Sequence, residues 1–329
     1  MRKGILFLLA LSLLAGSLQA RSLTDDYGRT VDLPETVTKI YAASPPLTMS
    51  VLAFDPALIA ALNFPWSDAQ RPYAGAAAWK PVAGGFFGQG QTPNFEVLAQ
   101  ARPDVILVWG GMPGVEKIVG KFDALGIPVL LVRNASIRDL ATQFALLGRL
   151  TGNKARADAL VAYTEQTLAI IDALQPKLAA RTPVRYYFAE GPDGLSSECD
   201  GSFHLEPFAY AGAQNALECR MSSNYGMEKV SLETVMFADP DVIVAMEPVF
   251  ADAVREDPRW QGVRAVRDGR VLTVPSLPFN YITRPPSFMR LMGIRWLIRH
   301  FYPKWLEGGE KARFEALFFP GSNTAAPAR

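Results

Sequence analysis

Two segments of this chain repeat each other at a fixed separation, and this repeat constrains the fold more than any other feature of the sequence. The first copy covers residues 94–108 and the second covers residues 231–245, so matched positions lie 137 residues apart without a gap. Each copy opens with a residue that often caps helices, Asn94 or Ser231, and continues through Pro-Asp into a run of apolar, largely β-branched residues. We therefore predict that each copy is a short helix followed by a buried strand.

Glycines followed by apolar runs at residues 126–132 and 269–274 extend the similarity between the two halves. Alternating helices and strands are typical of βαβ units, and this order occurs in residues 30–135 and again in residues 183–280. We predict an α/β fold class with two pseudo-symmetric three-layer lobes, each built on a mostly parallel sheet.

The segment between the two halves has the apolar spacing of helices. Apolar residues from Ile137 to Leu150 recur at helical intervals, and a second helix is expected from about Lys154 to Leu174. A long backbone helix should therefore join the lobes and limit how far they move. The predicted division is an N-terminal lobe at residues 21–135, a connector at 136–180, a C-terminal lobe at 181–320 and a disordered tail at 321–329.

The first 20 residues have the pattern of a secretory signal peptide. Arg2 and Lys3 precede an apolar stretch from Gly4 to Ala15, which is too short to span a bilayer, and the small residue Ala20 stands at the expected cut. Because no cysteine lies near this position, we predict a soluble periplasmic protein with a cleaved signal peptide and no lipid anchor. A signal anchor that stays attached is the alternative.

Charge and cysteine content narrow the function further. The 33 Lys and Arg residues nearly balance the 32 Asp and Glu residues without a long run of either sign, so we expect no nucleic-acid partner. The two cysteines, Cys199 and Cys219, favour a disulfide in an oxidising compartment. A metal pair is the alternative, but their spacing is not CxxC and the chain has only 2 histidines.

Five groups of short motifs occur in a fixed order along the chain. They are residues 26–34, Gly84-Gly85 with residues 93–96 and 103–104, residues 230–233 with 240–241, residues 260–271, and residues 284–287. Together they resemble the substrate-binding proteins of iron-siderophore, cobalamin and related metal-chelate ABC transporters, over nearly all of the chain after residue 20. The resemblance implies a periplasmic receptor that delivers its ligand to an inner-membrane ABC permease, without catalytic activity or a cofactor.

The resemblance also implies a role for two glutamates at matched positions of the repeat. In this family one glutamate on each lobe meets arginines of the permease, and the matching residues here are Glu96 and Glu233. Charge-assisted pairs of this kind favour docking and set its register. The alternative is that each glutamate only stabilises the first turn of its helix through the helix dipole.

We expect the receptor to be a monomer.

In two-lobed α/β proteins the ligand lies in the crevice between the lobes, at the C-terminal ends of the strands. Our candidate ligand-binding residues in the loops expected there are Ser44, Phe86, Trp109, His204, Tyr281 and Arg284. Arg284 precedes two prolines, which we expect to hold its backbone extended beside a helix that starts near Ser287. Its guanidinium would bind an anionic group of the ligand or, alternatively, hold its own loop in place.

The expected ligand is a preassembled metal chelate or an oxyanion, because two histidines are too few to bind a free metal ion directly. Tyr281 or His204 would contact a metal only within a chelate. The aromatic loops favour an iron–siderophore complex, and molybdate or tungstate, cobalamin, haem and a nickel chelate are the alternatives. A ligand sensor or chaperone and an exported α/β enzyme are the other classes, although no GxSxG or HExxH motif supports an enzyme.

Overall fold

The structure of the protein, a computed structural model, describes residues 21–86, 92–222, 225–320 and 322. The predicted signal peptide and most of the predicted C-terminal tail lie outside these residues. The described helices are α1 (Pro45–Phe54), α2 (Arg71–Ala74), α3 (Phe95–Ala101), α4 (Val115–Asp123), α5 (Asp139–Thr151), α6 (Lys154–Ala179), α7 (Glu206–Tyr210), α8 (Leu232–Ala238), α9 (Pro248–Ala253), α10 (Arg264–Arg267), α11 (Arg290–Phe301) and α12 (Glu310–Phe318).

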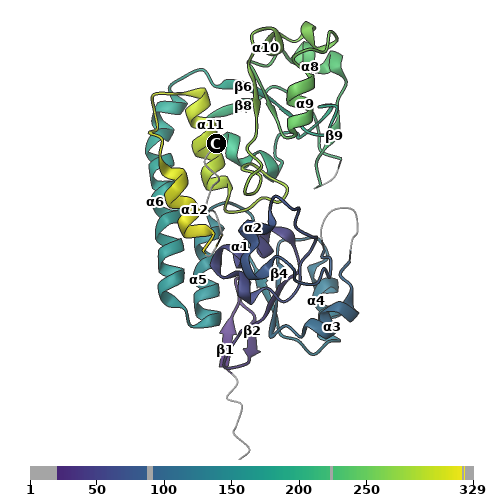
Figure 1. Ribbon diagram of the computed structural model, residues 1–329, viewed down its shortest axis with the longest axis vertical. Coiled ribbons are helices and arrows are strands. Elements are labelled where there is room, and N and C mark those ends of the chain that lie inside the picture. The colour runs from purple at the N-terminus through teal and green to yellow at the C-terminus, as the bar shows by residue number, and fades with distance from the viewer. Residues whose placement is uncertain (1–20, 87–91, 223–224, 321, 323–329) are drawn as a thin grey trace, which may run out of the picture.

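Two parallel sheets form the centres of the two lobes (Figure 1). The N-terminal sheet has the order β3 (Ile40–Ala42), β4 (Val105–Trp109), β5 (Val129–Val132). The C-terminal sheet has the order β11 (Val271–Thr273), β10 (Val242–Ala245), β6 (Val184–Ala189), β8 (Ala213–Asn215). Two antiparallel pairs complete the strands, β1 (Arg21–Thr24) with β2 (Thr30–Leu33) and β7 (Ser196–Ser197) with β9 (Glu228–Lys229). The predicted fold class is confirmed.

Each central strand is apolar on both faces because helices cover the sheet on both sides. In β4, Val105 and Leu107 face one core cluster, whereas Ile106 and Val108 face another. The same alternation divides the residues of β10 between two clusters. One cluster includes residues of both sheets and of α1, α5, α6, α11 and α12, so a continuous apolar core joins the lobes.

The repeat predicted from the sequence is present in three dimensions. The side chains of Asn94 and Ser231 accept hydrogen bonds from backbone amides in the first turns of α3 and α8. The residue that follows each helix has a left-handed backbone, Arg102 with φ 49° and Asp239 with φ 42°. These two positions also lie 137 residues apart. The matched backbone geometry shows that the two copies form the same helix–strand unit.

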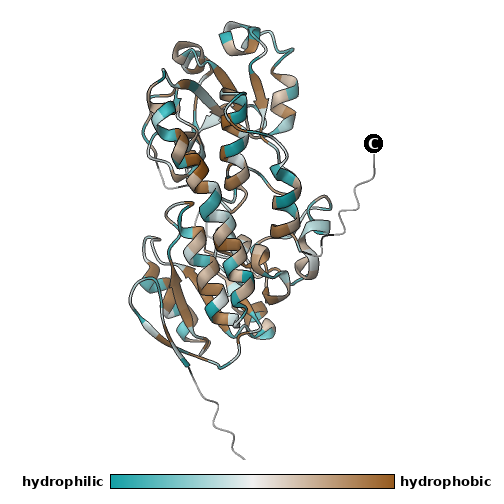
Figure 2. Ribbon diagram, turned by 90° about the vertical axis from the view of Figure 1, so that its left-hand side faces the viewer, coloured by the Kyte–Doolittle hydropathy of each residue, from teal (hydrophilic) through white to brown (hydrophobic). Residues whose placement is uncertain are grey.

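The predicted connector is a pair of helices, α5 and α6, and α6 is 26 residues long. Asn153 caps α6, and Arg156 donates hydrogen bonds to the carbonyl oxygens of Phe54 and Leu317, which ties α6 to the ends of α1 and α12. Figure 2 views these helices from outside and shows hydrophilic residues interspersed along them. Within the described part of the chain, no helix is long and apolar enough to cross a membrane.

Candidate functional site

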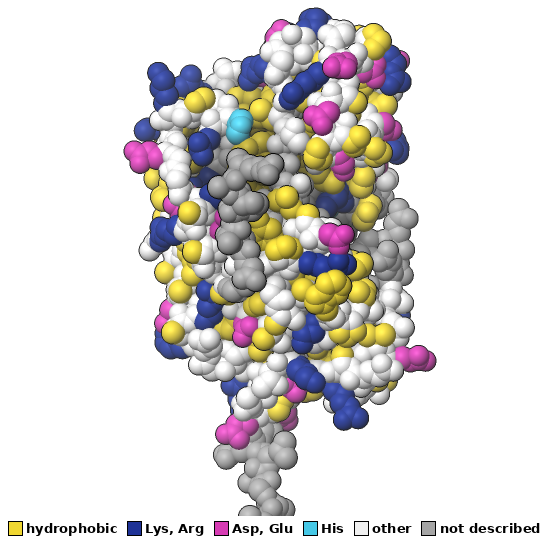
Figure 3. All heavy atoms as spheres, viewed as in Figure 1, with side chains coloured by type: hydrophobic (Ala, Val, Ile, Leu, Met, Phe, Trp, Pro, Cys, Tyr) yellow, Lys and Arg dark blue, Asp and Glu magenta, His cyan; other side chains and the backbone are white. Residues whose placement is uncertain are grey.

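A crevice separates the lobes where the C-terminal ends of the two sheets approach each other. Its narrow base is a cavity of about 10 Å³, which is no larger than a single water molecule requires. The residues that line it are Pro46, Asn134, Ser136, Ile137, Leu140, Phe203, Pro286, Ser287 and Arg290. Because these residues come from both lobes, the two sides of the crevice are in contact at this base. Figure 3 shows hydrophobic side chains gathered in the region where the lobes meet.

Two aromatic side chains meet across the crevice. Trp109 at the end of β4 contacts Phe203 of the C-terminal lobe, with ring centroids 5.6 Å apart and planes at 76°. Tyr27, in the turn between β1 and β2, lies over Gly110, where a Cβ atom would be 2.2 Å from the tyrosine ring. A larger residue at position 110 would therefore displace the tyrosine ring from this place. The sequence predicted Trp109 in the crevice but did not identify Tyr27, which is 44% exposed.

The C-terminal side of the crevice contains a buried ionic cluster centred on Arg284. Its Nε lies 2.5 Å from Glu190 Oε1, and its Nη2 lies 2.6 Å from Glu198 Oε1. Both glutamates are fully buried, so the guanidinium compensates two carboxylates that water does not reach. The geometry therefore supports the second interpretation of Arg284, in which it holds its own loop in place. Binding of a ligand by Arg284 stays a prediction.

The backbone at Arg284 differs from the extended conformation that we expected. Its φ is 59°, in the left-handed region, and the following helix α11 begins at Arg290 and not near Ser287. A left-handed backbone is costly for a residue with a long side chain, and the two ion pairs supply the interactions that hold it.

Burial raises the pKa of two carboxyl groups in and beside this cluster. Burial and the neighbouring Glu190 raise the pKa of Glu198 to about 7. Burial also raises the pKa of Glu247 at the start of α9, and its buried Oε2 has no hydrogen-bond partner among the described residues. The backbone packs closely against Glu198, because a Cβ atom at Gly226 would lie 2.1 Å from the Glu198 carboxylate. No spacing pattern of the sequence predicted this cluster.

His204 lies beside the cluster and is 5% exposed. Its Nδ1 hydrogen bonds with the hydroxyl of Thr283. Burial, together with the positive charges of Arg284 and Arg290, lowers the pKa of His204 to about 2. The imidazole is therefore neutral at physiological pH.

The predicted disulfide between Cys199 and Cys219 is confirmed, and it fixes the segment that leads to His204.

The other three candidate residues are almost completely buried. Phe86 is 7% exposed and packs edge-on against Phe122 in the core of the N-terminal lobe. Tyr281 is 5% exposed, and burial raises its pKa to about 12, so the phenol is protonated at neutral pH. Ser44 is 2% exposed, precedes α1, and has a buried hydroxyl without a partner among the described residues. Phe86 and Tyr281 thus present little surface to a ligand.

An ion pair that the sequence did not predict lies within the C-terminal lobe and links that lobe to the start of the connector. Arg290 Nη1 donates to Glu206 Oε2 at 2.9 Å, and the same carboxylate accepts hydrogen bonds from the hydroxyl of Ser136 at 2.6 Å and the amide of Ile137 at 2.9 Å. Glu206 belongs to the C-terminal lobe, whereas Ser136 and Ile137 begin the connector. The pair therefore fixes the base of the crevice.

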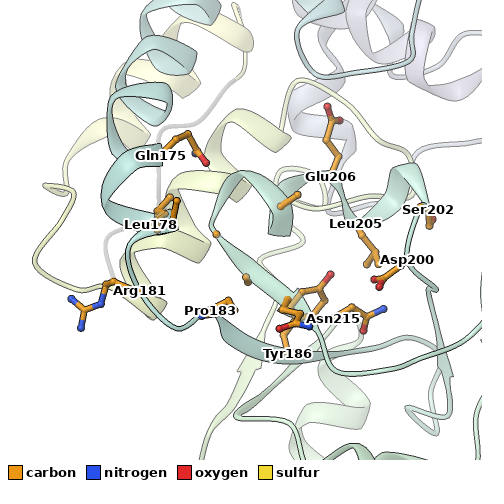
Figure 4. Close-up of a pocket in the computed structure, with 16 residues that line it drawn as sticks. Gln175, Leu178, Arg181, Pro183, Tyr186, Asp200, Ser202, Leu205, Glu206 and Asn215 are labelled. Carbon is orange, nitrogen blue, oxygen red and sulfur yellow. The ribbon is translucent and has the colours of Figure 1, made fainter.

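A larger hollow, of about 690 Å³, lies on the C-terminal lobe beside the edge strand β8 (Figure 4). Residues of α6, α7 and β8 form its walls, and Asp200 and Glu206 add carboxylates at its border. All of its lining residues belong to the end of the connector or to the C-terminal lobe. It is therefore a feature of one lobe, and the crevice is the better candidate because both lobes contribute to it.

The two glutamates predicted for docking occupy equivalent places. Glu96 and Glu233 are exposed residues in the first turns of α3 and α8. In Figure 1 both helices lie on the side of the molecule opposite α6. Hydrogen bonds from its own backbone amide and from Ser231 lower the pKa of Glu233, which keeps it ionised.

Among the described residues, no group of three or more His, Cys, Asp or Glu side chains is placed to hold a metal ion.

Two parallel α/β lobes joined by a long helix, with a crevice at the strand ends, define the class of solute receptors. Comparison with known proteins agrees, because the profile of the family described as periplasmic binding protein matches residues 78–277. The chain belongs to the periplasmic binding protein family. Members of this family bind and transport substrates and are not enzymes, as the sequence predicted.

Solved structures and a curated relative extend the comparison. An ABC transporter solute binding protein from Sulfurospirillum deleyianum is 31% identical, with a TM-score of 0.81 over 91% of this chain and 95% of that chain. The molybdate periplasmic binding protein MolA of Haemophilus influenzae, bound to molybdate, is 20% identical and shares the fold, with a TM-score of 0.69 over 91% of this chain and 98% of that chain. A cobalamin-binding protein of Halobacterium salinarum is 30% identical over 175 residues, which are 52% of this chain but only 45% of the relative.

Proposed function

We propose that this protein is the receptor of an ABC importer, which binds its ligand in the crevice between the lobes and delivers it to an inner-membrane permease. The observation that carries the proposal is the matched placement of Glu96 and Glu233 in the first turns of two equivalent helices. Export by a cleaved signal peptide, without a lipid anchor, would bring the receptor to the periplasm, where its disulfide is stable. Two exposed carboxylates on one side of a two-lobed protein suit a permease that presents one basic site to each lobe.

Docking by the two glutamates is tested with the double variant Glu96→Ala, Glu233→Ala. We expect uptake by cells to be lost while the affinity of the purified protein for its ligand is unchanged, because both side chains are exposed and belong to helices outside the crevice. Single variants should lose part of the uptake. Reduced ligand affinity in the double variant would contradict the docking role.

For the ligand, we propose a metal chelate with a bulky organic shell, and an iron–siderophore complex is the first to test. Tyr27, Trp109 and Phe203 supply flat apolar surface around the crevice, which suits an organic ligand better than a bare ion. Arg284 is already compensated by two carboxylates, so the ligand need not be strongly anionic on the C-terminal side. The likeness to a cobalamin-binding protein supports the same ligand class.

An oxyanion is the second candidate, because the buried hydroxyl of Ser44 has no partner among the described residues and the fold is shared with a molybdate-bound protein. Native mass spectrometry of the protein purified from its own periplasm separates the two candidates by the mass of the bound ligand. A bound mass of several hundred daltons that contains iron supports the siderophore complex. A mass near that of molybdate or tungstate contradicts it and supports the oxyanion.

A further inference from the structure

Helix α8 exposes two apolar side chains to solvent. Phe237 is 93% exposed and Met236 is 43% exposed. Exposed apolar surface of this size is unfavourable in water, and aromatic residues and methionine are enriched in protein interfaces. Single exposed apolar residues are normal on protein surfaces, so the significance of this pair depends on where it lies.

The matching helix of the other lobe shows that the fold does not require apolar residues here. Ala99 and Gln100 of α3 occupy the positions that correspond to Met236 and Phe237 across the repeat, and all four positions are exposed. The two helices have the same length and are both capped by a polar side chain. Each buries an apolar residue at the matching central position, Leu98 in α3 and Val235 in α8. The apolar pair is therefore an addition to α8 that the packing of the lobe does not explain.

The pair lies on the same face of α8 as the carboxylate that we propose for docking. Residues three and four positions apart are neighbours on a helix surface, so Met236 and Phe237 lie one turn from Glu233. Met236 packs over Gly262, where a Cβ atom would be 2.4 Å from the methionine methyl carbon, and this support leaves Phe237 as the projecting group. An exposed aromatic side chain and an exposed carboxylate therefore lie one turn apart on one face of α8.

We infer that Met236 and Phe237 form, with Glu233, a docking surface that inserts an aromatic side chain into an apolar recess of the permease beside the basic residue that meets Glu233. This inference rests on the proposed function and extends it to a contact that only the C-terminal lobe makes. Charge favours this occupant over two others. The adjacent carboxylate would be repelled by an anionic lipid surface, and in a symmetric dimer it would lie near its own copy. The nearby Arg264 is already paired with Asp239 and Asp241.

The test measures binding of the mature protein to a permease–ATPase complex from the same genome, held in nanodiscs and chosen because the wild-type protein binds it. The variant Met236→Ala, Phe237→Gln installs the residues of the N-terminal lobe at the matching positions. We expect its affinity to fall roughly tenfold or more, as for an interface hot spot. Ile170→Gln is the matched control, because Ile170 is 45% exposed on α6, on the opposite side of the molecule (Figure 1).

The remaining outcomes separate this inference from the proposed function. If Glu233→Gln weakens binding and the apolar variant does not, the inference is wrong and docking by the glutamates stands. If neither variant changes binding, docking by this face is wrong as well. Binding of the wild-type protein to empty nanodiscs, or a dimer in sedimentation that the variant abolishes, would assign Phe237 to lipid or to a second copy and would overturn the inference. All variants should remain folded and melt close to the wild-type temperature, because the altered side chains are at least partly exposed.

Discussion

The two lobes keep the same residue type at a matched position of the repeat where backbone amides need a partner. In the N-terminal lobe Asp104 accepts hydrogen bonds from the amides of Thr38 and Lys39, and in the C-terminal lobe Asp241 accepts one from the amide of Arg185. Each aspartate thus connects the start of its strand to the start of a neighbouring strand in the same sheet. The repeat thus keeps a side chain where backbone amides need a partner, whereas many other residues differ between the two copies.

The loops at the strand ends are not preserved in this way. On the N-terminal side of the crevice they carry Ser44, Trp109 and a glycine against which Tyr27 packs. On the C-terminal side they carry buried charges, with Arg284 held by Glu190 and Glu198. A common scaffold therefore carries aromatic, uncharged groups beside the crevice in one lobe and a buried ionic cluster in the other. The expected effects of substitutions should differ between the lobes accordingly.

The largest effect is expected for Glu206→Ala in the C-terminal lobe. The substitution leaves Arg290, which is 5% exposed, without its carboxylate and removes the hydrogen bonds to Ser136 and Ile137. Breaking a buried ion pair from one side typically costs about 3–5 kcal/mol of the free energy of unfolding, which urea denaturation measures. Asp68→Ala, which breaks an exposed pair with Arg71 in the N-terminal lobe, is the control and should leave stability unchanged. Equal losses in the two variants would contradict the difference between the lobes.

A smaller effect is expected from the matched aspartates of the repeat. Asp104 accepts three hydrogen bonds from Thr38 and Lys39, at 2.7, 3.0 and 2.8 Å. Asp241 accepts one from the amide of Arg185 at 2.9 Å and one from the partly exposed Arg264 at 3.0 Å. We expect Asp104→Ala to cost about 2 kcal/mol and Asp241→Ala about 1 kcal/mol, given the usual net value of a hydrogen bond. A larger loss for Asp241→Ala would show that the ion pair outweighs the backbone contacts.

Much of the fold was predictable because its signals are local. Caps, Pro-Asp pairs and apolar runs identify α3, β4, α8 and β10 from a few adjacent residues, and helical spacing identifies α5 and α6. The repeat predicted the two lobes, and the family resemblance added the expected docking role of Glu96 and Glu233. The division into domains at particular residues stays a prediction.

The crevice was less predictable because its residues meet only after the loops have folded. Glu190 and Glu198 stand in unremarkable surroundings in the sequence, and Arg284 reaches them from a segment more than 80 residues away. Aromatic residues in loops gave a misleading signal, since Phe86 and Tyr281 turn into the cores. Residue type and position after a strand do not determine whether a loop side chain points inward or toward the crevice.

A gradual effect, of about 0.7 kcal/mol per pH unit, is expected from pH in the C-terminal lobe, where His204 lies. The folded protein keeps His204 neutral because burial lowers its pKa to about 2, whereas the unfolded chain binds a proton below about pH 6.5. The stabilisation from the neutral imidazole is therefore complete above pH 6.5 and is lost as the pH falls. Between pH 7.5 and 5.5 the loss should be about 1.4 kcal/mol.

Glu198 opposes this dependence, so the wild-type profile alone cannot reveal it. Its pKa is raised to about 7, and its contribution is present below the unfolded value near 4.5 and is lost as the pH rises through 7. The measurement is therefore the difference in unfolding free energy between wild type and His204→Gln at each pH. We expect the advantage of the wild type to shrink by about 1.4 kcal/mol from pH 7.5 to 5.5 and, for Glu198→Gln, to grow over the same interval. If the difference in unfolding free energy between wild type and His204→Gln did not depend on pH, the imidazole would titrate in the folded protein as it does in the unfolded chain. The buried polar groups of this lobe would then be accessible to water.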